Sequence, residues 1–403
     1  MAAGRRSAAT TTDNSQATPL DRTLRLLDDL VMFPTVTLTS NLELVHHAEA
    51  ILDTIGATCT RTWDRTGNRA NLFATIGPPV DGGIVLSGHT DVVPADDHQW
   101  ASPPFVATRR DGRVHGRGTA DMKGFIACVL AMAPRFAAAD LVRPVHIALT
   151  FDEEVGCLGA PLLIAEMARA GPVPSAAIIG EPTMMGVMTA HKGCYEYTTT
   201  ITGVAGHGSA PSRAVNSIWH AARYVMRLHE LAEGLRARAP ADSPFDPPES
   251  TLSIGTITGG QARNVIPAAC SFDWEFRPIN DTDVRMVAEA VQQLEQEESA
   301  RLQALHPEAD ITTTIVGEVG GLDTPADDPA VELMRRLLDD LVLGVVPYNT
   351  EAGLFQQAGI SSVVCGPGSI DVAHRPDEYV EVAQLEACLA MLERVVDELA
   401  TPA

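Results

Sequence analysis

The stretch IVLSGHTDVVP, at residues 84–94, decides how the rest of the sequence is interpreted. Its first four residues, Ile84 to Ser87, are apolar or small, as is typical of a strand in the middle of a parallel sheet. His89 and Asp91 follow the strand almost directly. Ligands of open α/β sheets bind beyond the carboxyl ends of such strands, so an imidazole and a carboxylate stand where a site is expected. Taken alone, the stretch is explained equally well by a loop histidine and an aspartate that caps the next element.

The composition indicates a globular protein of more than one domain. A chain of 403 residues exceeds a single ordinary core. The net charge of −23 argues against nucleic acid and anionic membranes as partners, because both require a basic surface. No apolar run approaches the roughly 20 residues that span a bilayer. The seven cysteines are scattered without a CxxC pair, which argues against a disulfide scaffold and favours a reducing, cytoplasmic location.

The pattern along the chain predicts two domains and a tail. Residues 1–19 are small and polar, and we expect them to be disordered. Residues 20–192 and 318–403 alternate helical patterns with short apolar strands, which predicts an α/β domain with a mostly parallel central sheet and helices on both faces. Between residues 193 and 317 four strands, the first rich in threonine, accompany two helices. We therefore expect a smaller α+β domain inserted into the larger one.

Acidic or imidazole residues follow one expected strand of the larger domain after another. They are His89, Asp91, Asp121, Glu153, Glu154, Glu181 and His374. Carboxylates and imidazoles without thiolates suit divalent ions such as zinc, cobalt or manganese. Three carboxylates and two histidines exceed the three protein ligands of a usual catalytic zinc, and they match two ions that share a bridging carboxylate. One acidic strand end is commonplace, but chance is a poor explanation for five.

Five motifs in this order carry a resemblance to a known family. They are SGHTDVVP (87–94), GRGTADMKG (116–124), DEEVG (152–156), GEPT (180–183) and AHRPDE (373–378). They resemble the motifs of the M20 family of co-catalytic metallohydrolases, and the match spares only the N-terminal tail. The resemblance implies an enzyme that hydrolyses a linear amide with two divalent metal ions, zinc or alternatively cobalt.

The resemblance also implies a set of metal ligands. Asp121 would bridge the two ions. His89 and Glu181 would complete the ligands of one ion, and Glu154 and His374 those of the other. Two ions held in this way lower the pKa of a bound water.

Two further carboxylates of the motifs have implied catalytic roles. Glu153 would be the general base that takes a proton from water and passes it to the leaving amine. Asp91 would orient His89 by a contact to its far ring nitrogen. The reverse assignment, with Glu153 as the ligand and Glu154 as the base, stays open.

The inserted segment carries three more candidates by the same resemblance. His207, in a glycine-rich loop, matches a histidine that reaches the active site of a partner subunit, and Asn264 matches a residue that assists it. Arg277 matches an arginine that holds a substrate carboxylate. Without the resemblance, His207 is an exposed loop residue and Arg277 a partner in an interface salt bridge. The resemblance thus implies that residues 193–317 form a dimerisation and lid domain of a homodimer.

Residues 348–380 are especially similar to the acetylornithine deacetylases of the family. We therefore expect a small-molecule substrate, an N-acyl amino acid, and release of acetate and ornithine in arginine biosynthesis. Glu351 or Asp371 could hold the cationic side chain of that substrate. The alternatives are a succinyl-diaminopimelate desuccinylase, an aminoacylase or a carboxypeptidase-like peptidase of the family, and, from another class, a non-catalytic metal-binding scaffold.

Overall fold

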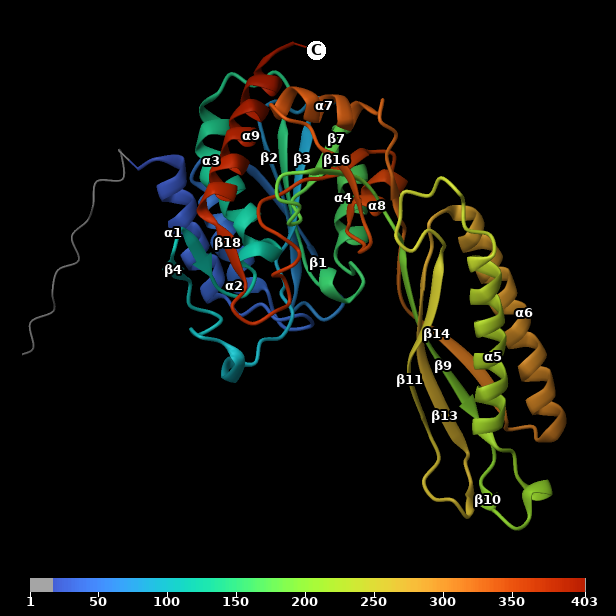
Figure 1. Cartoon of the computed structure of the whole chain (residues 1–403). Helices are drawn as coiled ribbons and strands as arrows, with labels where there is room; N and C mark the ends of the chain where they lie inside the picture. The colour runs from blue at the N-terminus through green and yellow to red at the C-terminus, as the bar shows by residue number, and fades with distance from the viewer. Residues whose placement is uncertain (1–16, 403) are drawn as a thin grey trace, which may run out of the picture.

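The computed structural model describes residues 17–402, which form a broad lobe and a long, narrow lobe (Figure 1). The broad lobe contains a nine-stranded sheet in the order β1-β2-β6-β3-β7-β17-β8-β15, with β16 also paired to β8. Its strands are β1 (Thr58–Trp63), β2 (Ala70–Ile76), β3 (Ile84–His89), β6 (Val145–Thr150), β7 (Ala176–Ile179), β8 (Val187–His191), β15 (Leu322–Asp323), β16 (Leu343–Val346) and β17 (Ser361–Val364).

The middle of this sheet is parallel. β3 pairs in parallel with β6 on one side and β7 on the other, and β7 pairs in parallel with β17. The flanking pairs β1–β2, β2–β6, β17–β8 and β15–β8 are antiparallel. The predicted α/β fold class is therefore confirmed, with a mixed sheet whose parallel part lies at its centre. All six residues of β3 are buried, as its apolar composition predicts.

Helices cover both faces of the broad sheet. Ile84 and Leu86 face the layer that contains α1, α2, α3, α7 and α9, whereas Val85 faces the layer of α4 and α8. Side chains alternate across a strand, so a run of apolar residues serves both layers at once. The helices are α1 (Pro19–Met32), α2 (Leu42–Asp53), α3 (Gly124–Ala138), α4 (Ala160–Ala170), α7 (Pro329–Leu337), α8 (Ala352–Gln357) and α9 (Val382–Ala400).

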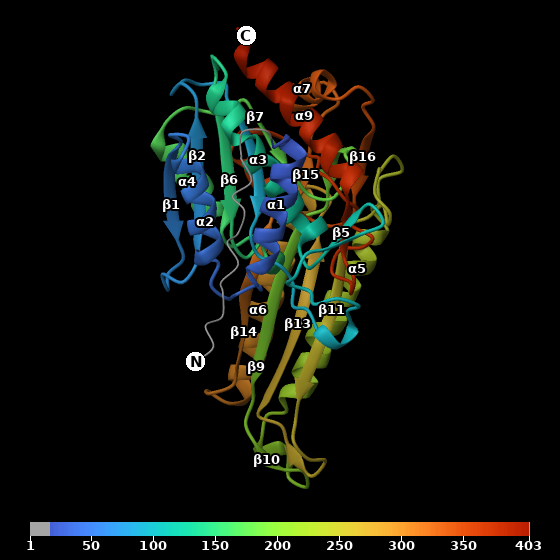
Figure 2. The ribbon, with the colours of Figure 1, turned by 90° about the vertical axis from the view of Figure 1, so that its left-hand side faces the viewer.

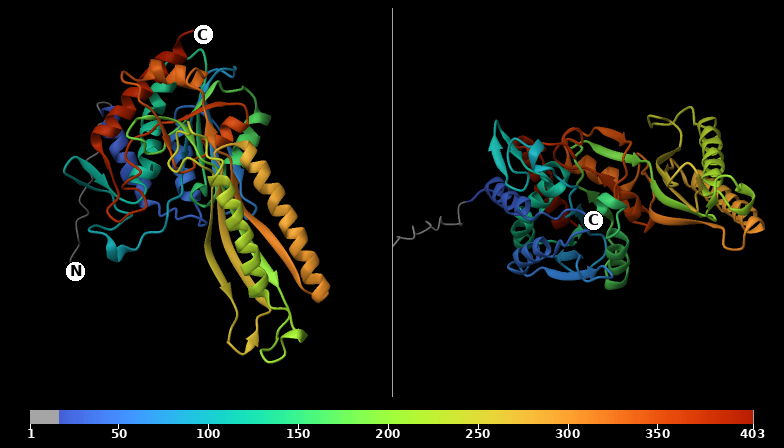
Figure 3. Two further views of the ribbon diagram at one scale, coloured as in Figure 1. Left: turned by 45° about the vertical axis from the view of Figure 1, so that its right-hand side comes forward. Right: turned by 90° about the horizontal axis from the view of Figure 1, so that it is seen from below.

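The narrow lobe is a second layered structure with its own core. Its antiparallel sheet has the order β11-β13-β9-β14, and α5 and α6 run along one face of it (Figure 3). Cys270, Phe272 and Phe276 of β13 are buried at alternate positions, so the sheet has one face toward the helices. The elements are β9 (Cys194–Thr202), β11 (Thr251–Gly259), β13 (Ala269–Arg277), β14 (Asp310–Val319), α5 (Ser217–Arg236) and α6 (Asp281–Leu305). We propose residues 193–317 as the inserted domain.

Short elements complete the fold. A two-stranded ladder of β10 (Gly206–His207) and β12 (Val265–Ile266) lies at the far end of the narrow lobe (Figure 2). A small sheet in the broad lobe joins β4 (Thr108–Arg110), β5 (Arg113–His115) and β18 (Tyr379–Glu381). Helical turns cover Asp97–Gln99, Glu153–Val155 and Pro211–Arg213, and a turn with non-helical backbone angles at Asp121 and Met122 covers Thr119–Lys123. Runs of two or three residues are too short to show a period, so the sequence did not predict these strands.

The N-terminal boundary is set by a helix cap. Residues 1–16, most of the predicted disordered tail, lie outside the described residues. α1 begins at Pro19 because the Thr18 side chain accepts a hydrogen bond from the Asp21 amide while the Asp21 carboxylate accepts one from the Thr18 amide. Within residues 17–402, every helix is too short or too polar to cross a bilayer.

His146, in β6, should make stability fall in mild acid. It is 1% exposed and bonded to Thr75, and burial lowers its pKa from 6.5 to about 4. The unfolded chain therefore binds a proton at pH values where the folded protein does not, so stability is lost as pH falls from about 6.5 toward 4. Between pH 7.5 and 5.5 this one group accounts for about 1.4 kcal/mol of lost stability. Urea unfolding of His146→Gln should show a pH dependence smaller by about that amount.

The exposed His229 supplies the matched control for this measurement. His229→Gln should keep the pH dependence of the wild-type protein. An unchanged slope in His146→Gln would show that His146 is not neutral in the folded state.

Candidate metal centre

The candidate site lies at the edge of the broad sheet where its parallel strands end. β3 ends at His89, and Glu181 follows β7 after one glycine. Glu153 and Glu154 lie in the helical turn that follows β6. The carboxyl ends of parallel strands meet at one edge of a sheet, so loops that are distant in sequence converge there. Two loops complete the group, namely the turn before α3 with Asp121 and the loop after β17 with His374.

Asp121 lies between the two histidines. Its Oδ1 is 2.9 Å from Nε2 of His89, and its Oδ2 is 3.2 Å from Nε2 of His374. Each carboxylate oxygen therefore faces a different imidazole, which is the arrangement that a bridging carboxylate requires.

The remaining acidic groups divide between the two histidines. Oε2 of Glu154 lies 3.0 Å from Nε2 of His374, and Oε1 of Glu181 lies 3.7 Å from Nε2 of His89. Donor atoms of His89, Asp121 and Glu154 fall within 4.8 Å of one another, as do those of His89, Glu153 and Glu181. The structure thus brings all five predicted ligands, and Glu153, into one cluster.

The cluster concentrates negative charge in a buried place. Asp121, Glu153 and Glu181 are at most 9% exposed, and the side chain of Glu154 is 7% exposed. Burial raises the pKa of Glu153 and of Glu181 well above the usual range. Burial also opposes ionisation of Asp121, but hydrogen bonds from His374 and His89 outweigh it and hold the pKa of Asp121 below its usual range.

The charge of this cluster fits a pair of divalent ions. Hydrogen bonds to Asp121 and Glu154 raise the pKa of His374 to about 10, so the site favours a positive charge at this position. Within the described part of the chain, no lysine or arginine lies within 4.0 Å of these four carboxylates. Buried carboxylates need paired cations or metal ions. Oxygen and imidazole donors without thiolates are those that zinc, cobalt and manganese accept.

Asp91 contacts more of the site than the sequence predicts. Nδ1 of His89 lies 2.9 Å from the backbone carbonyl of Asp91 and 3.6 Å from its Oδ1. The two carboxylate oxygens accept hydrogen bonds from the amides of Glu153, at 3.1 Å, and Glu154, at 3.3 Å. The carbonyl therefore sets the orientation of the imidazole, while the carboxylate fixes the turn that carries both glutamates.

Glu153 has a neighbour that sequence reasoning missed. The buried thiol of Cys157 donates a weak hydrogen bond, 3.4 Å long, to Oε1 of Glu153. The two residues are four apart in DEEVGC, a spacing that could have drawn attention to the cysteine. Glu153 and Glu154 point toward different histidines, so adjacent carboxylates can have different roles.

A cavity of about 240 Å³ opens onto the cluster. It reaches from the acidic residues to the end of the narrow lobe that adjoins the broad lobe. There Arg277 forms an ion pair with Glu275, 3.0 Å between Nη2 and Oε2. Glu196, Tyr348 and Asn349 also line it, and sequence reasoning singled out none of them. The lining residues are Asp121, Glu153, Glu154, Gly156, Glu181, Cys194, Glu196, Arg277, Tyr348, Asn349, Ile370 and His374.

Glu351 is not among the residues that line this cavity. It is 1% exposed at the start of α8, where its Oε2 accepts a hydrogen bond from the Ser87 hydroxyl, 3.3 Å away. Burial raises the pKa of Glu351 to about 7. The expectation that Glu351 contacts the substrate side chain therefore fits the geometry poorly, because other side chains cover its carboxylate. Its position behind β3 indicates that it supports this strand through Ser87. Asp371, the other candidate, is exposed.

His207 and Asn264 lie far from the cluster. His207 is an exposed residue of β10, and the amide of the next residue, Gly208, donates to the carbonyl of Asn264 at 2.8 Å. The two predicted residues are thus neighbours, but neither lines the cavity at the metal centre. β10 lies at the tip of the narrow lobe, far from the broad sheet in both side views (Figures 1 and 2).

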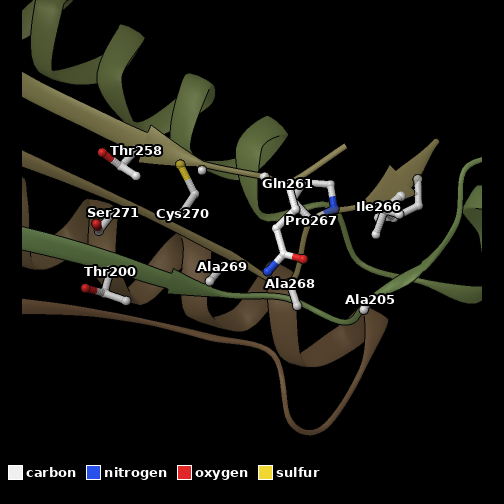
Figure 4. Close-up of a pocket in the computed structure, with 13 residues that line it drawn as sticks. Thr200, Ala205, Thr258, Gln261, Ile266, Pro267, Ala268, Ala269, Cys270 and Ser271 are labelled. Atoms are coloured by element: carbon white, nitrogen blue, oxygen red, sulfur yellow. The ribbon is translucent and has the colours of Figure 1, made fainter. Parts of the chain in front are cut away.

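A second cavity, of about 430 Å³, lies near that tip (Figure 4). Its polar side chains are hydroxyls, one amide and one thiol, and among the described residues that line it there is no carboxylate, imidazole, lysine or arginine. It therefore offers no acid–base chemistry. The residues around it are Thr200, Ala205, Thr258, Gly259, Gly260, Gln261, Val265, Ile266, Pro267, Ala268, Ala269, Cys270 and Ser271.

Known proteins resemble this chain in both sequence and fold. An acetylornithine deacetylase from Myxococcus xanthus is 36% identical over 376 residues, which is 92% of this chain and 95% of the relative. An acetylornithine deacetylase from Yersinia pestis is 35% identical over 82% of this chain and 84% of its own length.

Solved structures extend the likeness at the level of the fold. An M20 family metallo-carboxypeptidase from Sulfolobus solfataricus superposes with a TM-score of 0.73 at 17% identity, over 94% of this chain and 99% of its own. A dinuclear metal binding peptidase of the M20 family from Bacillus subtilis has a TM-score of 0.64 at 16% identity, over 95% and 99%.

A model of a protein family also matches most of the chain. Residues 85–398 match the description "Peptidase family M20/M25/M40", a region that begins inside β3 and ends inside α9. This region contains every residue of the acidic cluster. The chain therefore belongs to peptidase family M20/M25/M40 and is a hydrolase of amide bonds.

Proposed function

We propose that the protein is a two-metal amidohydrolase that converts N-acetylornithine to acetate and ornithine, a reaction of arginine biosynthesis in the cytoplasm. The observation that supports it most directly is Asp121, whose two oxygens face His89 and His374. The identity to acetylornithine deacetylases over most of the chain supports the choice of substrate.

The contacts of the cluster support one assignment of ligands to the two ions. Asp121 would bridge, His89 and Glu181 would hold one ion, and Glu154 and His374 would hold the other. Two divalent ions, zinc or cobalt, polarise an amide carbonyl and lower the pKa of water when bound at such ligands. Glu153 would then be available for proton transfer, since among the described residues the hydrogen bond to its carboxylate is the weak one from the Cys157 thiol.

Glu153 then moves one proton twice. As water attacks the acetyl carbonyl carbon, the Glu153 carboxylate accepts a proton from that water. It returns the proton to the ornithine nitrogen as the carbon–nitrogen bond breaks, which makes the amine a good leaving group. Asp91 holds the backbone of Glu153 and so keeps the base in place.

Removing the base should abolish turnover without removing the metals. Glu153→Gln keeps the size of the side chain but has no carboxylate to accept a proton, so kcat should fall about 10²- to 10⁴-fold. Elemental analysis of the purified variant should still find two ions per chain. Glu166→Gln, which alters an exposed ion pair in α4, is the matched control and should keep wild-type kcat. Wild-type turnover in Glu153→Gln would exclude this residue as the base.

The cavity also suggests how the substrate is chosen. At the end beside the narrow lobe Arg277 can hold the α-carboxylate of the substrate, and Glu196 also lines the cavity. Among the described residues no lysine, arginine or histidine lies within 4.0 Å of Glu196, whereas Glu275 already pairs with Arg277. Two carboxylates against one guanidinium leave this end negative. A substrate with a cationic side chain complements it, and an acidic acyl group such as succinyl does not.

A substrate panel tests this specificity. Wild-type kcat/KM should be highest for N-acetylornithine and at least about tenfold lower for N-acetylnorleucine, its neutral isostere, because a charged hydrogen bond is worth roughly 1.5–3 kcal/mol. Glu196→Gln should remove most of that difference by raising KM for N-acetylornithine alone. Preference for N-succinyl-diaminopimelate, N-acetylmethionine or a dipeptide would identify another activity of the family. Metal content without hydrolysis of any compound would indicate a non-catalytic scaffold.

The distance of His207 from the cluster supports a homodimer in which the site is shared. We propose that His207, assisted by Asn264, donates a hydrogen bond to the oxyanion in the partner's site, where such donors are worth about 10²–10³ in kcat. The exposed tip of the narrow lobe is the surface that would reach it.

Mixed dimers test whether His207 acts across the interface. His207→Ala and Glu153→Gln should each be nearly inactive. After exchange of subunits in equal amounts, about a quarter of wild-type activity should return, because half of the dimers are mixed and each has one complete site. Recovery should be absent if His207 serves its own subunit, since no site then combines an intact base with an intact histidine.

A further inference from the structure

A buried carboxylate outside the ligand set contacts the backbone at Asp121. Glu378 is 1% exposed, and its Oε1 accepts hydrogen bonds from the amides of Ala120, at 2.9 Å, and Asp121, at 3.1 Å. Its Oε2 accepts a hydrogen bond from Nη1 of Arg117, 2.7 Å away. One carboxylate thus satisfies three donors, two of them on the loop that carries the candidate bridging ligand.

Arg117 connects this carboxylate to two other loops. The guanidinium is 3% exposed and lies over the ring of Trp100, 5.1 Å from its centroid. Nη1 also reaches the carbonyl of Arg375, and Nη2 reaches the carbonyl of Pro94, both at 3.4 Å. The segment after Asp91, the turn of Asp121 and the loop of His374 therefore meet at a single ion pair.

Glu378 lies close in sequence to one candidate metal ligand and contacts the backbone of another. It follows His374 by four residues in the loop between β17 and β18. Asp121 has non-helical backbone angles, φ −121° and ψ 91°, so the amides around it cannot all find partners in a regular helix. Glu378 supplies the missing acceptor. In doing so it ties the backbone of Asp121 to the loop of His374.

A gain in folding stability is a weak explanation for the buried ion pair of Arg117 and Glu378. Burying two charges costs free energy that apolar side chains of similar volume would not cost. An apolar residue could not accept hydrogen bonds from two amides, and so could not hold Asp121 in place. The pair between Arg113 and Glu381, three residues further on, is about 40% exposed and touches no part of the cluster. It offers an internal comparison.

We propose that Glu378, held by Arg117, is a positioning residue of the metal centre: it sets where Asp121 lies relative to His374 and thereby the affinity for the ions. The proposal rests on the metal centre proposed above. Outer-shell partners of metal ligands typically contribute about 10- to 100-fold in metal affinity.

Zinc titration of the metal-free protein tests the proposal without any substrate. Glu378→Asp keeps the charge but is one methylene shorter, so it cannot reach both Arg117 and the two amides. Competition with a chromophoric chelator should show that at least one of the two Zn²⁺ ions binds about tenfold more weakly than in wild type. Glu381→Asp, at the exposed pair, should bind zinc within about twofold of wild type.

Glu378→Gln is the second variant. It keeps the length of the side chain, but its amide NH₂ must face either Arg117 or a backbone N–H, so it should also lose at least about tenfold in zinc affinity. Thermal unfolding of the metal-free proteins separates positioning from folding. If Glu378 positions the metal ligands, Glu378→Asp should lose zinc affinity while the Tm of this variant stays close to that of the wild-type protein.

Three results would overturn the proposal. The first is wild-type zinc affinity in both Glu378 variants, whatever their Tm. The second is failure of both variants to fold while Glu381→Asp folds, which would make the pair a folding determinant. The third is absence of zinc binding in the wild-type protein, which would overturn the proposed metal centre as well. In the first two cases the metal centre and its proposed function stand.

Discussion

Mutual repulsion among buried carboxylates is the constraint on which the rest of the structure depends. Asp121, Glu153, Glu154 and Glu181 crowd together with only two imidazoles between them. Like charges at such distances in a desolvated place destabilise the folded state unless cations balance them. Two divalent ions bring four positive charges to four carboxylates. The same groups that make the site costly to fold without metal are those that would retain the proposed metals.

The fold opposes this repulsion by fixing the backbone of the loops that carry the carboxylates. The parallel strands are buried on both sides, so their ends are rigid. Backbone amides and carbonyls, and not the metals alone, then fix the ligand loops. Asp91 binds the amides of Glu153 and Glu154. Ion ligands that are pre-ordered in this way cannot move apart to relieve their repulsion, and affinity for cations rises accordingly.

Much of this arrangement can be predicted from the sequence because its signals are local. A strand end followed by a carboxylate or an imidazole is visible in a few adjacent residues, and the parallel topology gathers such ends at one edge. This is why the residues of the cluster and both layered lobes could be anticipated. The limits appear where a role depends on packing. Glu351 resembles a substrate contact in the sequence, yet it is buried behind β3. Cys157 stands four residues after Glu153, but this spacing alone does not show that its thiol contacts the Glu153 carboxylate.

The narrow lobe shows a second limit, which is one of distance. His207 and Asn264 are neighbours at its tip, and a four-stranded sheet separates them from the acidic cluster. An exposed histidine on a short ladder has no chemistry of its own, since nothing around it desolvates or polarises a substrate. A catalytic role for His207 would require a second protein surface to pack against it. The acidic cluster and the proposed oxyanion donor lie at opposite ends of the molecule. The proposed site would therefore be completed by pairing with a second copy, and the narrow lobe would span the distance between the two sets of residues.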